Sequence, residues 1–328
     1  YQITSGARNA ALGYAACGAV TTGTDNVGIG YNGCGQVTTG NGNVGIGRNT
    51  LNTSNTASHN IAIGYTALAS TTGGNNVAIG REVMVANTSG SNNTGIGAQA
   101  LLDNTTGGTN TAVGSFSLAD NTTAANNTAV GSYALNKNTN GTANTAVGVN
   151  ALRHSVSAAY NTACGMGALQ NNTAASNTAV GYGAMTHNTT GTRNTAVGEG
   201  SSNSNTSAND NTSVGREALM KNQTGGSNTA IGRSALRTLG TEVGGSTVFG
   251  QLNTAVGAQA LYSQNTDGMN TAVGANCLQN STSAGYNVGM GRLAAHSCTT
   301  GSQNVTIGYA AAQNATTGQN NVTIGYNS

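Results

Sequence analysis

A five-residue motif of the type Asn-Thr-Ala-Val-Gly recurs along the whole chain of 328 residues. Its closing glycine occurs 19 times; of the 18 intervals between these glycines, fifteen are 17 residues long, two are 16 and one is 25. Such a period is typical of solenoids, in which each repeat packs only on its neighbours. We therefore expect a single array over residues 1–328. The longest interval contains an insert at 238–252, which is either a protruding recognition loop or a degenerate extra strand.

Charged residues keep to certain positions of the repeat, which we number 1 to 17 from the Asn. Only 6% of the chain is charged, and no Lys, Arg, Asp or Glu occurs at positions 1–5, 8 or 9. Burying an unpaired charge is costly, so these positions are expected to face the interior. The net charge of +2 is too small for a nucleic-acid-binding protein, and no apolar run is long enough for a membrane helix.

The repeat favours an all-β fold, a parallel β-solenoid of about 19 coils with 17 residues per coil. We expect one strand at positions 1–5, a corner at the glycine of position 5, a second short strand at positions 8 and 9, and a turn at the recurrent Thr-Thr-Gly. The Asn at position 1 should stack as a hydrogen-bonded ladder, which we favour over glycosylation because it recurs with or without a sequon. The expected apolar core stacks residues of position 4 (Ile63, Val113, Val130, Val147) and of position 9 (Leu118, Leu135, Leu152).

One coil offers few large apolar side chains against the entropy of ordering 17 residues. The small residues at positions 3 and 8 would let another sheet approach closely. We therefore expect several chains to pack together as a fibre, with an intertwined or side-by-side homotrimer as the favoured arrangement. Because the chain begins and ends inside a repeat, we expect it to be a segment of a longer fibre.

The segments 177–185 (Asn-Thr-Ala-Val-Gly-Tyr-Gly-Ala-Met) and 76–80 (Asn-Val-Ala-Ile-Gly) resemble known repeats. They are similar to repeats of bacteriophage tail fibres and to the head repeats of trimeric autotransporter adhesins, whose motif reads roughly Asn-Ser-Val-Ala-Ile-Gly. The resemblance covers essentially the whole chain and implies a homotrimeric β-solenoid fibre outside the cell, with left-handed coils in the adhesin heads. This chain departs from those heads in having a longer, 17-residue unit.

Motifs for catalysis or for metal binding are not recognisable. The four histidines form no pair with metal-ligand spacing, no Ser-His-Asp set can be argued, and the Gly-x-Gly patterns recur in every repeat rather than in one phosphate-binding loop. We therefore expect no enzyme activity, no cofactor and no metal. Asp120 and Lys137 are expected to form a surface ion pair between neighbouring coils.

Four of the five cysteines occupy positions expected to be in the core, and Cys298 is harder to place. Cys17 and Cys34 share position 9 in adjacent repeats, so stacking would bring them within disulfide reach. They are either a disulfide or, like Cys164 and Cys277, small hydrophobic residues.

Position 6, directly after the glycine corner, carries Tyr or Arg in eleven of the 19 repeats. This edge either contacts sugars and anionic surface polymers or simply covers the corner with bulky side chains. The residues are Tyr14, Tyr31, Arg48, Tyr65, Arg81, Tyr182, Arg216, Arg233, Arg292, Tyr309 and Tyr326.

These observations favour a structural shaft of a phage tail fibre or of an extracellular surface filament, which supports attachment to a host or a surface. Its expected partners are identical chains, with a cell-surface glycan or other fibre proteins as further candidates, and neither nucleic acid nor membrane insertion is expected. The alternative is a glycan-binding adhesin that uses the Tyr/Arg edge. An ice-binding solenoid is disfavoured because the Thr-Thr pairs would point to opposite sides of a strand. A polysaccharide-degrading β-helix would need a recurring acidic cluster, whereas the carboxylates are scattered.

Overall fold

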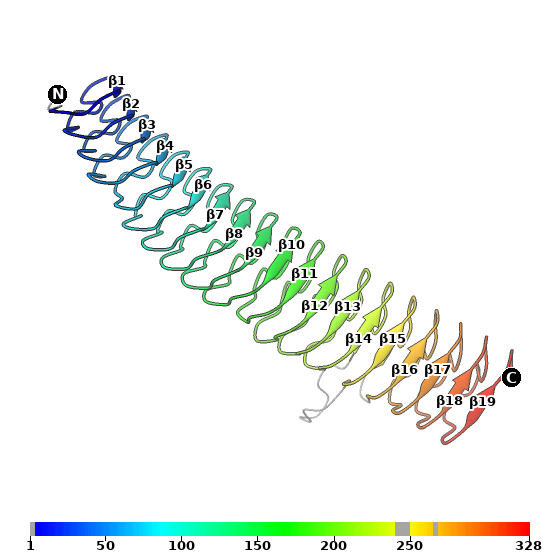
Figure 1. Cartoon of the computed structure of the whole chain (residues 1–328). Helices are drawn as coiled ribbons and strands as arrows, with labels where there is room; N and C mark the ends of the chain where they lie inside the picture. Colours follow the sequence, from blue (N-terminus) through cyan, green and yellow to red (C-terminus); the bar gives the residue numbers. More distant parts are fainter. Residues whose placement is uncertain (1–3, 240–249, 265–267) are drawn as a thin grey trace. The chain divides into compact units, whose positions relative to one another are not determined.

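The computed structural model describes residues 4–239, 250–264 and 268–328. The chain divides into two compact units, Tyr1–Asn161 and Thr162–Ser328, and both are built from the same short parallel strands without any helix in their described parts (Figure 1). Most of the insert expected at 238–252 lies outside the described residues, so neither interpretation of it is tested.

Each coil contributes one strand of three residues, at repeat positions 2–4. The strands of the first unit are β1 (Ala10–Leu12), β2 (Val27–Ile29), β3 (Val44–Ile46), β4 (Ile61–Ile63), β5 (Val77–Ile79), β6 (Thr94–Ile96), β7 (Thr111–Val113), β8 (Thr128–Val130) and β9 (Thr145–Val147). Those of the second unit are β10 (Thr162–Cys164), β11 (Thr178–Val180), β12 (Thr195–Val197), β13 (Thr212–Val214), β14 (Thr229–Ile231), β15 (Thr254–Val256), β16 (Thr271–Val273), β17 (Val288–Met290), β18 (Val305–Ile307) and β19 (Val322–Ile324).

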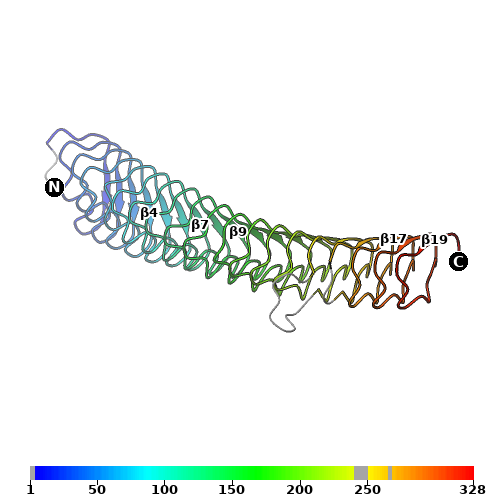
Figure 2. The ribbon, with the colours of Figure 1, turned by 90° about the horizontal axis from the view of Figure 1, so that it is seen from below.

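Within each unit, every strand pairs in parallel with the strand one repeat further on, and like positions face each other. Thr111 lies opposite Thr128, for example, and Ala112 lies opposite Ala129. The register holds even across the 25-residue interval, where Thr229 lies opposite Thr254. The expected parallel β-solenoid, with one coil per repeat, is confirmed, and Figure 2 shows the coils of each unit following one another.

The strands turn position 3 inward and positions 2 and 4 outward. Ala129 and Ala146 are fully buried, whereas Val130 and Val147, at position 4, are 36% and 37% exposed. The expectation that position 4 forms the core is therefore wrong. It fails for Ile63 and Val113 as well, because both are only half-buried. The alternation of a strand permits only one of the two sets to face inward, and a narrow coil has room for the smaller one.

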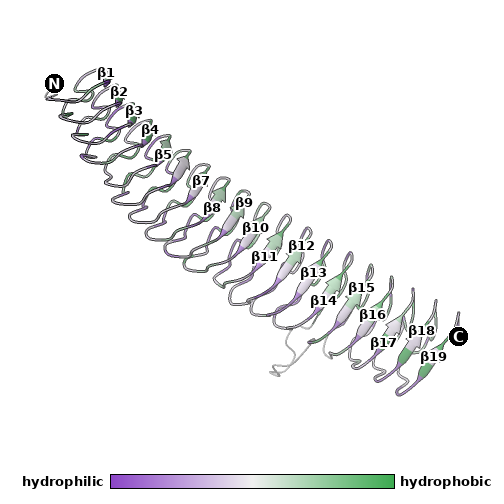
Figure 3. Ribbon diagram, in the orientation of Figure 1, coloured by the Kyte–Doolittle hydropathy of each residue, from purple (hydrophilic) through white to green (hydrophobic). Residues whose placement is uncertain are grey.

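The small residues at position 3 meet the opposite wall of their own coil. A Cβ added to Gly45 would lie 2.9 Å from the Oγ1 of Thr50, at position 8 of the same repeat, and 2.6 Å from the Sγ of Cys34, at position 9 of the preceding repeat. These positions therefore let the two walls of one coil approach, and the expectation that they admit a second chain is wrong. Figure 3 shows the resulting distribution, in which most strand arrows are white to green while purple is concentrated in the turns.

The leucines of position 9 are buried as expected, and Leu118, Leu135 and Leu152 have no exposed surface. The second strand expected here is absent from the described coils, because these leucines adopt left-handed backbone angles, with φ of 49° for Leu118 and 50° for Leu135 and Leu152. That conformation costs an L-residue about 1–2 kcal/mol. Burying the side chain contributes about 1.5–3 kcal/mol and offsets this cost. The backbone N–H of Leu118 donates to the carbonyl of Ala134 in the next coil (3.0 Å).

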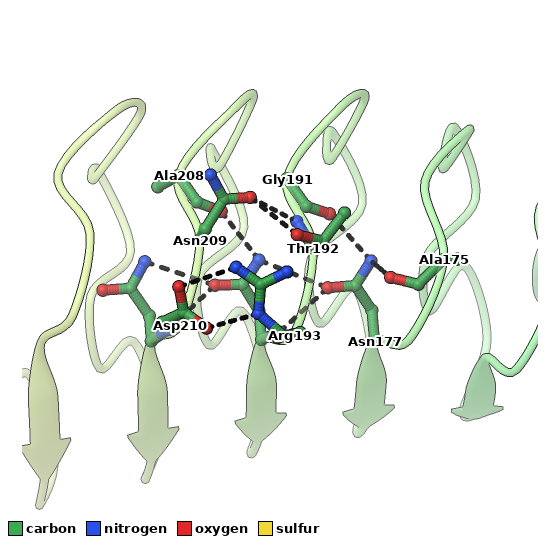
Figure 4. A network of polar contacts seen from close by, with 10 residues as sticks. Ala175, Asn177, Gly191, Thr192, Arg193, Ala208, Asn209 and Asp210 are labelled. Carbon is green, nitrogen blue, oxygen red and sulfur yellow. Dashed lines mark hydrogen bonds and ion pairs between the residues drawn. The ribbon is translucent and has the colours of Figure 1, made fainter.

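The Asn side chains at position 1 form the expected column, which we call the first asparagine ladder (Figure 4). The backbone N–H and the Nδ2 of Asn194 both donate to Oδ1 of Asn177, at 3.0 and 3.2 Å, and its Nδ2 also donates to the carbonyl of Ala208 at 2.7 Å. The same backbone-to-Oδ1 bond recurs from Asn26 to Asn161 in the first unit and from Asn194 to Asn321 in the second. Asn211, which begins a glycosylation sequon, is 3% exposed, so the ladder interpretation is the one that fits.

A second asparagine ladder, at position 12, was not expected from the sequence. Nδ2 of Asn104 donates to Oδ1 of Asn87 (2.8 Å), Asn121 donates likewise to Asn104 (2.7 Å), and Asn138 to Asn121 (3.1 Å). The next residue of this column is Ser155, which is too short to continue it. Oδ1 of Asn138 and Oγ of Ser155 are consequently buried without a hydrogen-bond partner in the structure.

Replacing Leu118 by Ala should destabilise the first unit by about 2–5 kcal/mol, because it leaves a cavity in a fully packed coil. Guanidinium unfolding monitored by circular dichroism would measure the change. Thr123→Ala, at an exposed position of the same coil, is the control and should alter stability by less than about 0.5 kcal/mol. Equal effects of the two substitutions would contradict the assignment of Leu118 to the core.

Replacing Ser155 by Asn should stabilise the first unit by about 1 kcal/mol, since it supplies the donor that Oδ1 of Asn138 lacks. The readout is the midpoint of thermal unfolding. Ser155→Ala removes the unpaired hydroxyl without adding a donor and should fall short of the Asn variant. A midpoint lower than that of the unmodified chain would show that the second ladder has no room for another amide.

Candidate functional site

The described residues contain no cluster with the composition of a metal site. Within residues 4–239, 250–264 and 268–328, no three His, Cys, Asp or Glu side chains gather where they could hold a metal ion. His59, His154 and His187 are exposed, and His296 uses its Nε2 to contact Oε1 of Gln279 at 2.8 Å. The same ranges contain no helix that could span a membrane. The remaining candidates are surfaces.

The first surface is the outer side of the strands, formed by positions 2 and 4, which we call the sheet face. It carries β-branched side chains at nearly every coil and no charged residue at all. Ile61 and Ile96 are each 37% exposed, Val180 is 37% and Ile231 is 41% exposed. An uncharged surface with a regular column of exposed apolar side chains is typical of an interaction site.

The second surface is the column of side chains at position 6, which we call the corner column. All eleven Tyr and Arg residues predicted there are exposed. They follow a glycine that must lack a side chain: Gly131 has φ of 128°, and a Cβ on it would lie 2.6 Å from the carbonyl oxygen of Gly148 in the next coil. Position 6 is thus the first place after the strand where a large side chain can project outward.

Neighbouring members of the corner column stack on one another. The rings of Tyr14 and Tyr31 lie 5.1 Å apart at 12°, and the Arg48 guanidinium lies between Tyr31 and Tyr65, at 5.7 and 5.8 Å from their centroids. In the second unit, Arg292 lies over Tyr309 (5.7 Å), which in turn stacks on Tyr326 (5.2 Å). Because the stacking covers the ring faces between these neighbours, solvent there meets ring edges, hydroxyl groups and guanidinium N–H groups.

A further aromatic pair near this edge was not predicted from the sequence. Phe116 and Tyr133, at position 7, stack at 5.1 Å and 5°, and the Arg153 guanidinium lies 4.9 Å from the Tyr133 centroid. Their separation of 17 residues is the signal that would have found the pair.

In the second unit, Nε of Arg237 bonds Oε2 of Glu217 (2.9 Å), and this contact holds the pKa of Glu217 below its usual range.

Ion pairs join charged residues of adjacent coils at two repeat positions. One is position 17, which lies before the strand, and the other is position 11. The predicted pair of Asp120 and Lys137 is confirmed, with 2.8 Å between Oδ2 and Nζ. At position 17, Arg193 makes two hydrogen bonds to the carboxylate of Asp210, at 2.6 and 3.0 Å, and these bonds lower the pKa of Asp210 (Figure 4). Both residues are largely exposed, so this pair contributes little to stability.

The cysteines behave as buried or surface thiols and not as a disulfide. Cys17 and Cys34 are buried and free, so the disulfide considered from their spacing is not formed. The Cys17 thiol donates to the carbonyl of Ala10 (3.7 Å) and the Cys34 thiol to the carbonyl of Val27 (3.4 Å). The neighbouring Cys17 sulfur, together with burial, raises the pKa of Cys34. Cys164, expected in the core, is exposed because it occupies the outward position 4. Cys277 is buried as expected.

Comparisons with family models, with curated proteins and with solved structures give no match. The functional argument therefore rests on the two surfaces described above. Of the residues predicted for a surface role, the structure brings Tyr14, Tyr31, Arg48 and Tyr65 into one stacked row, whereas Tyr182 is flanked by Met166 and Glu199 in its own column.

Cys164 should react first with a thiol reagent, because it is the exposed cysteine of the chain. Burial raises the pKa of Cys277 to about 12, so little of its reactive thiolate forms at neutral pH. Timed alkylation followed by peptide mass spectrometry should show Cys164 labelled well before Cys34 or Cys277. Prior labelling of Cys277 would contradict the inward orientation of position 8.

Proposed function

We propose that this chain is a non-catalytic structural element, a shaft segment of a tail fibre or of another extracellular filament, and that it self-associates through the sheet face. The observation that carries the proposal is the sheet face itself. It presents large apolar side chains to solvent at position 4 while the interior of each coil is filled mainly by Ala and Leu. Leaving a Val or Ile exposed at position 4 of nearly every coil is unfavourable for a chain that works alone.

Self-association suits this face for two further reasons. It lacks charge, so like faces of identical chains can approach without burying an unpaired ion. Its side chains repeat with each coil, so one copy can pack on another along many coils in the same way. The preference for three chains, and for a location outside the cell or on a virion, comes from the resemblance to tail-fibre and adhesin repeats. Other fibre proteins are further candidate partners.

A second function is favoured by one observation on the same face. Position 2 is Thr from Thr94 to Thr145 in the first unit and from Thr162 to Thr271 in the second, and these residues point outward beside the apolar column of position 4. A flat array with regular Thr is what an ice-binding solenoid uses, and the Thr residues of position 2 are distinct from the adjacent Thr-Thr pairs of the turns. Thermal hysteresis of the purified chain would favour this second function, and its absence would exclude it.

Introducing Lys at both Val130 and Val147 should abolish self-association, since two charges would have to be buried in the interface. Analytical ultracentrifugation should report a multimer, with a trimer preferred, for the unmodified chain and a monomer for the double variant. Lys at Thr123 and Asn140, two exposed turn positions, adds the same charge away from the sheet face and should leave the mass unchanged. A monomeric unmodified chain would contradict the proposal.

A further inference from the structure

The Arg48 guanidinium is held in place by two aromatic rings, although the residue is exposed. Its Cζ lies 5.7 Å from the centroid of Tyr31 in the preceding coil and 5.8 Å from that of Tyr65 in the following coil. The two tyrosines are themselves 49% and 46% exposed. Contact on both sides restricts the rotamers of a side chain that would otherwise be mobile, so the group is pre-organised for binding.

Arg48 also lacks an acidic neighbour. Within the part of the first unit that the structure describes, no carboxylate forms an ion pair with it, in contrast to Arg8 and Arg81. Nη1 of Arg81 lies 3.3 Å from Oε2 of Glu82, and Nε of Arg8 lies 2.6 Å from Oδ1 of Asp25. The N–H groups of Arg48 are therefore available to an external acceptor.

We propose that Arg48, Tyr31 and Tyr65 form a binding site for a carboxylate group of an acidic polysaccharide. The planar fork of a guanidinium matches a carboxylate with two parallel hydrogen bonds. The phenol hydroxyls on either side can donate to or accept from the hydroxyls of the sugar that bears the carboxylate. Because Arg48 covers one face of each ring, the site recognises its ligand through hydrogen bonds and charge, and neutral sugars lack the group that the guanidinium needs.

The surroundings of the site favour a polymer over a single sugar. Tyr14 and Arg81 continue the corner column on either side, so five successive coils present an aromatic or guanidinium group at the same position. An extended chain that follows the column would meet equivalent groups at each coil. A related arrangement, Arg292 over Tyr309, recurs in the second unit.

This site lies apart from the surface used in the proposed self-association. The corner column is at position 6, beyond the glycine corner, whereas the sheet face is at positions 2 and 4. Glycan binding and assembly therefore use different side chains, and each can be lost without the other.

The test is a titration of the immobilised full chain with polygalacturonate, which carries carboxylates, heparin, which carries mainly sulfates, and dextran, which is neutral. We expect polygalacturonate to bind most tightly and dextran not to bind. Arg48→Ala should weaken polygalacturonate binding about tenfold or more, since a charge-assisted pair is lost. Arg48→Lys keeps the charge but not the fork, and should weaken binding less than Ala. Arg8→Ala removes the same charge at position 17 and should leave binding unchanged.

Four results would overturn the proposal: no binding of polygalacturonate, equal losses in Arg48→Ala and Arg8→Ala, tighter binding of heparin, or binding of dextran at a similar affinity. Circular dichroism should confirm that each variant keeps its fold. Light scattering should give the Arg48→Ala variant the same mass as the unmodified chain, so that loss of glycan binding is distinguished from loss of assembly.

Discussion

Hydrogen bonds between neighbouring coils hold this molecule together, and the first asparagine ladder is the clearest case. A strand of three residues offers few ladder bonds of its own. Each buried Asn adds bonds to the preceding coil and to the turn at position 15 of its own coil, as Asn194 does with Asn177 and Ala208. Only an amide side chain has both the donors and the acceptor that this arrangement needs. An Asp would lack the donors and a Ser would be too short.

The narrow interior follows from the same arrangement and explains the unusual surface. Ala at position 3 and Leu at position 9 fill the coil, so Val and Ile at position 4 have no place inside. Each coil therefore separates its residues into three kinds: Ala, Leu and amide groups within, uncharged and mostly β-branched groups on the sheet face, and aromatic or charged groups at the corners. The two proposed activities rest on the second and third kinds respectively.

The period, the parallel strands, the burial of Leu118 and the first asparagine ladder could all be predicted from the sequence, because stacking makes like residues neighbours. The inward position of Ala129 and the outward position of Val130 could not, since hydrophobicity alone ranks them the other way. The left-handed conformation of Leu135 was equally hidden, because leucine has no intrinsic preference for it. At the candidate surfaces, the position of Arg48 was evident from its spacing, whereas its enclosure by Tyr31 and Tyr65 required their ring positions.

The preserved register between Thr229 and Thr254 has an evolutionary consequence. Eight additional residues between two strands leave the pairing on both sides intact, so a coil depends on the identity of its neighbours and hardly on the length of chain that connects them. Duplication or deletion of a whole repeat would recreate the same contacts at the junction. Such a gene can lengthen or shorten its product in steps of one coil, with little selection needed to repair each change.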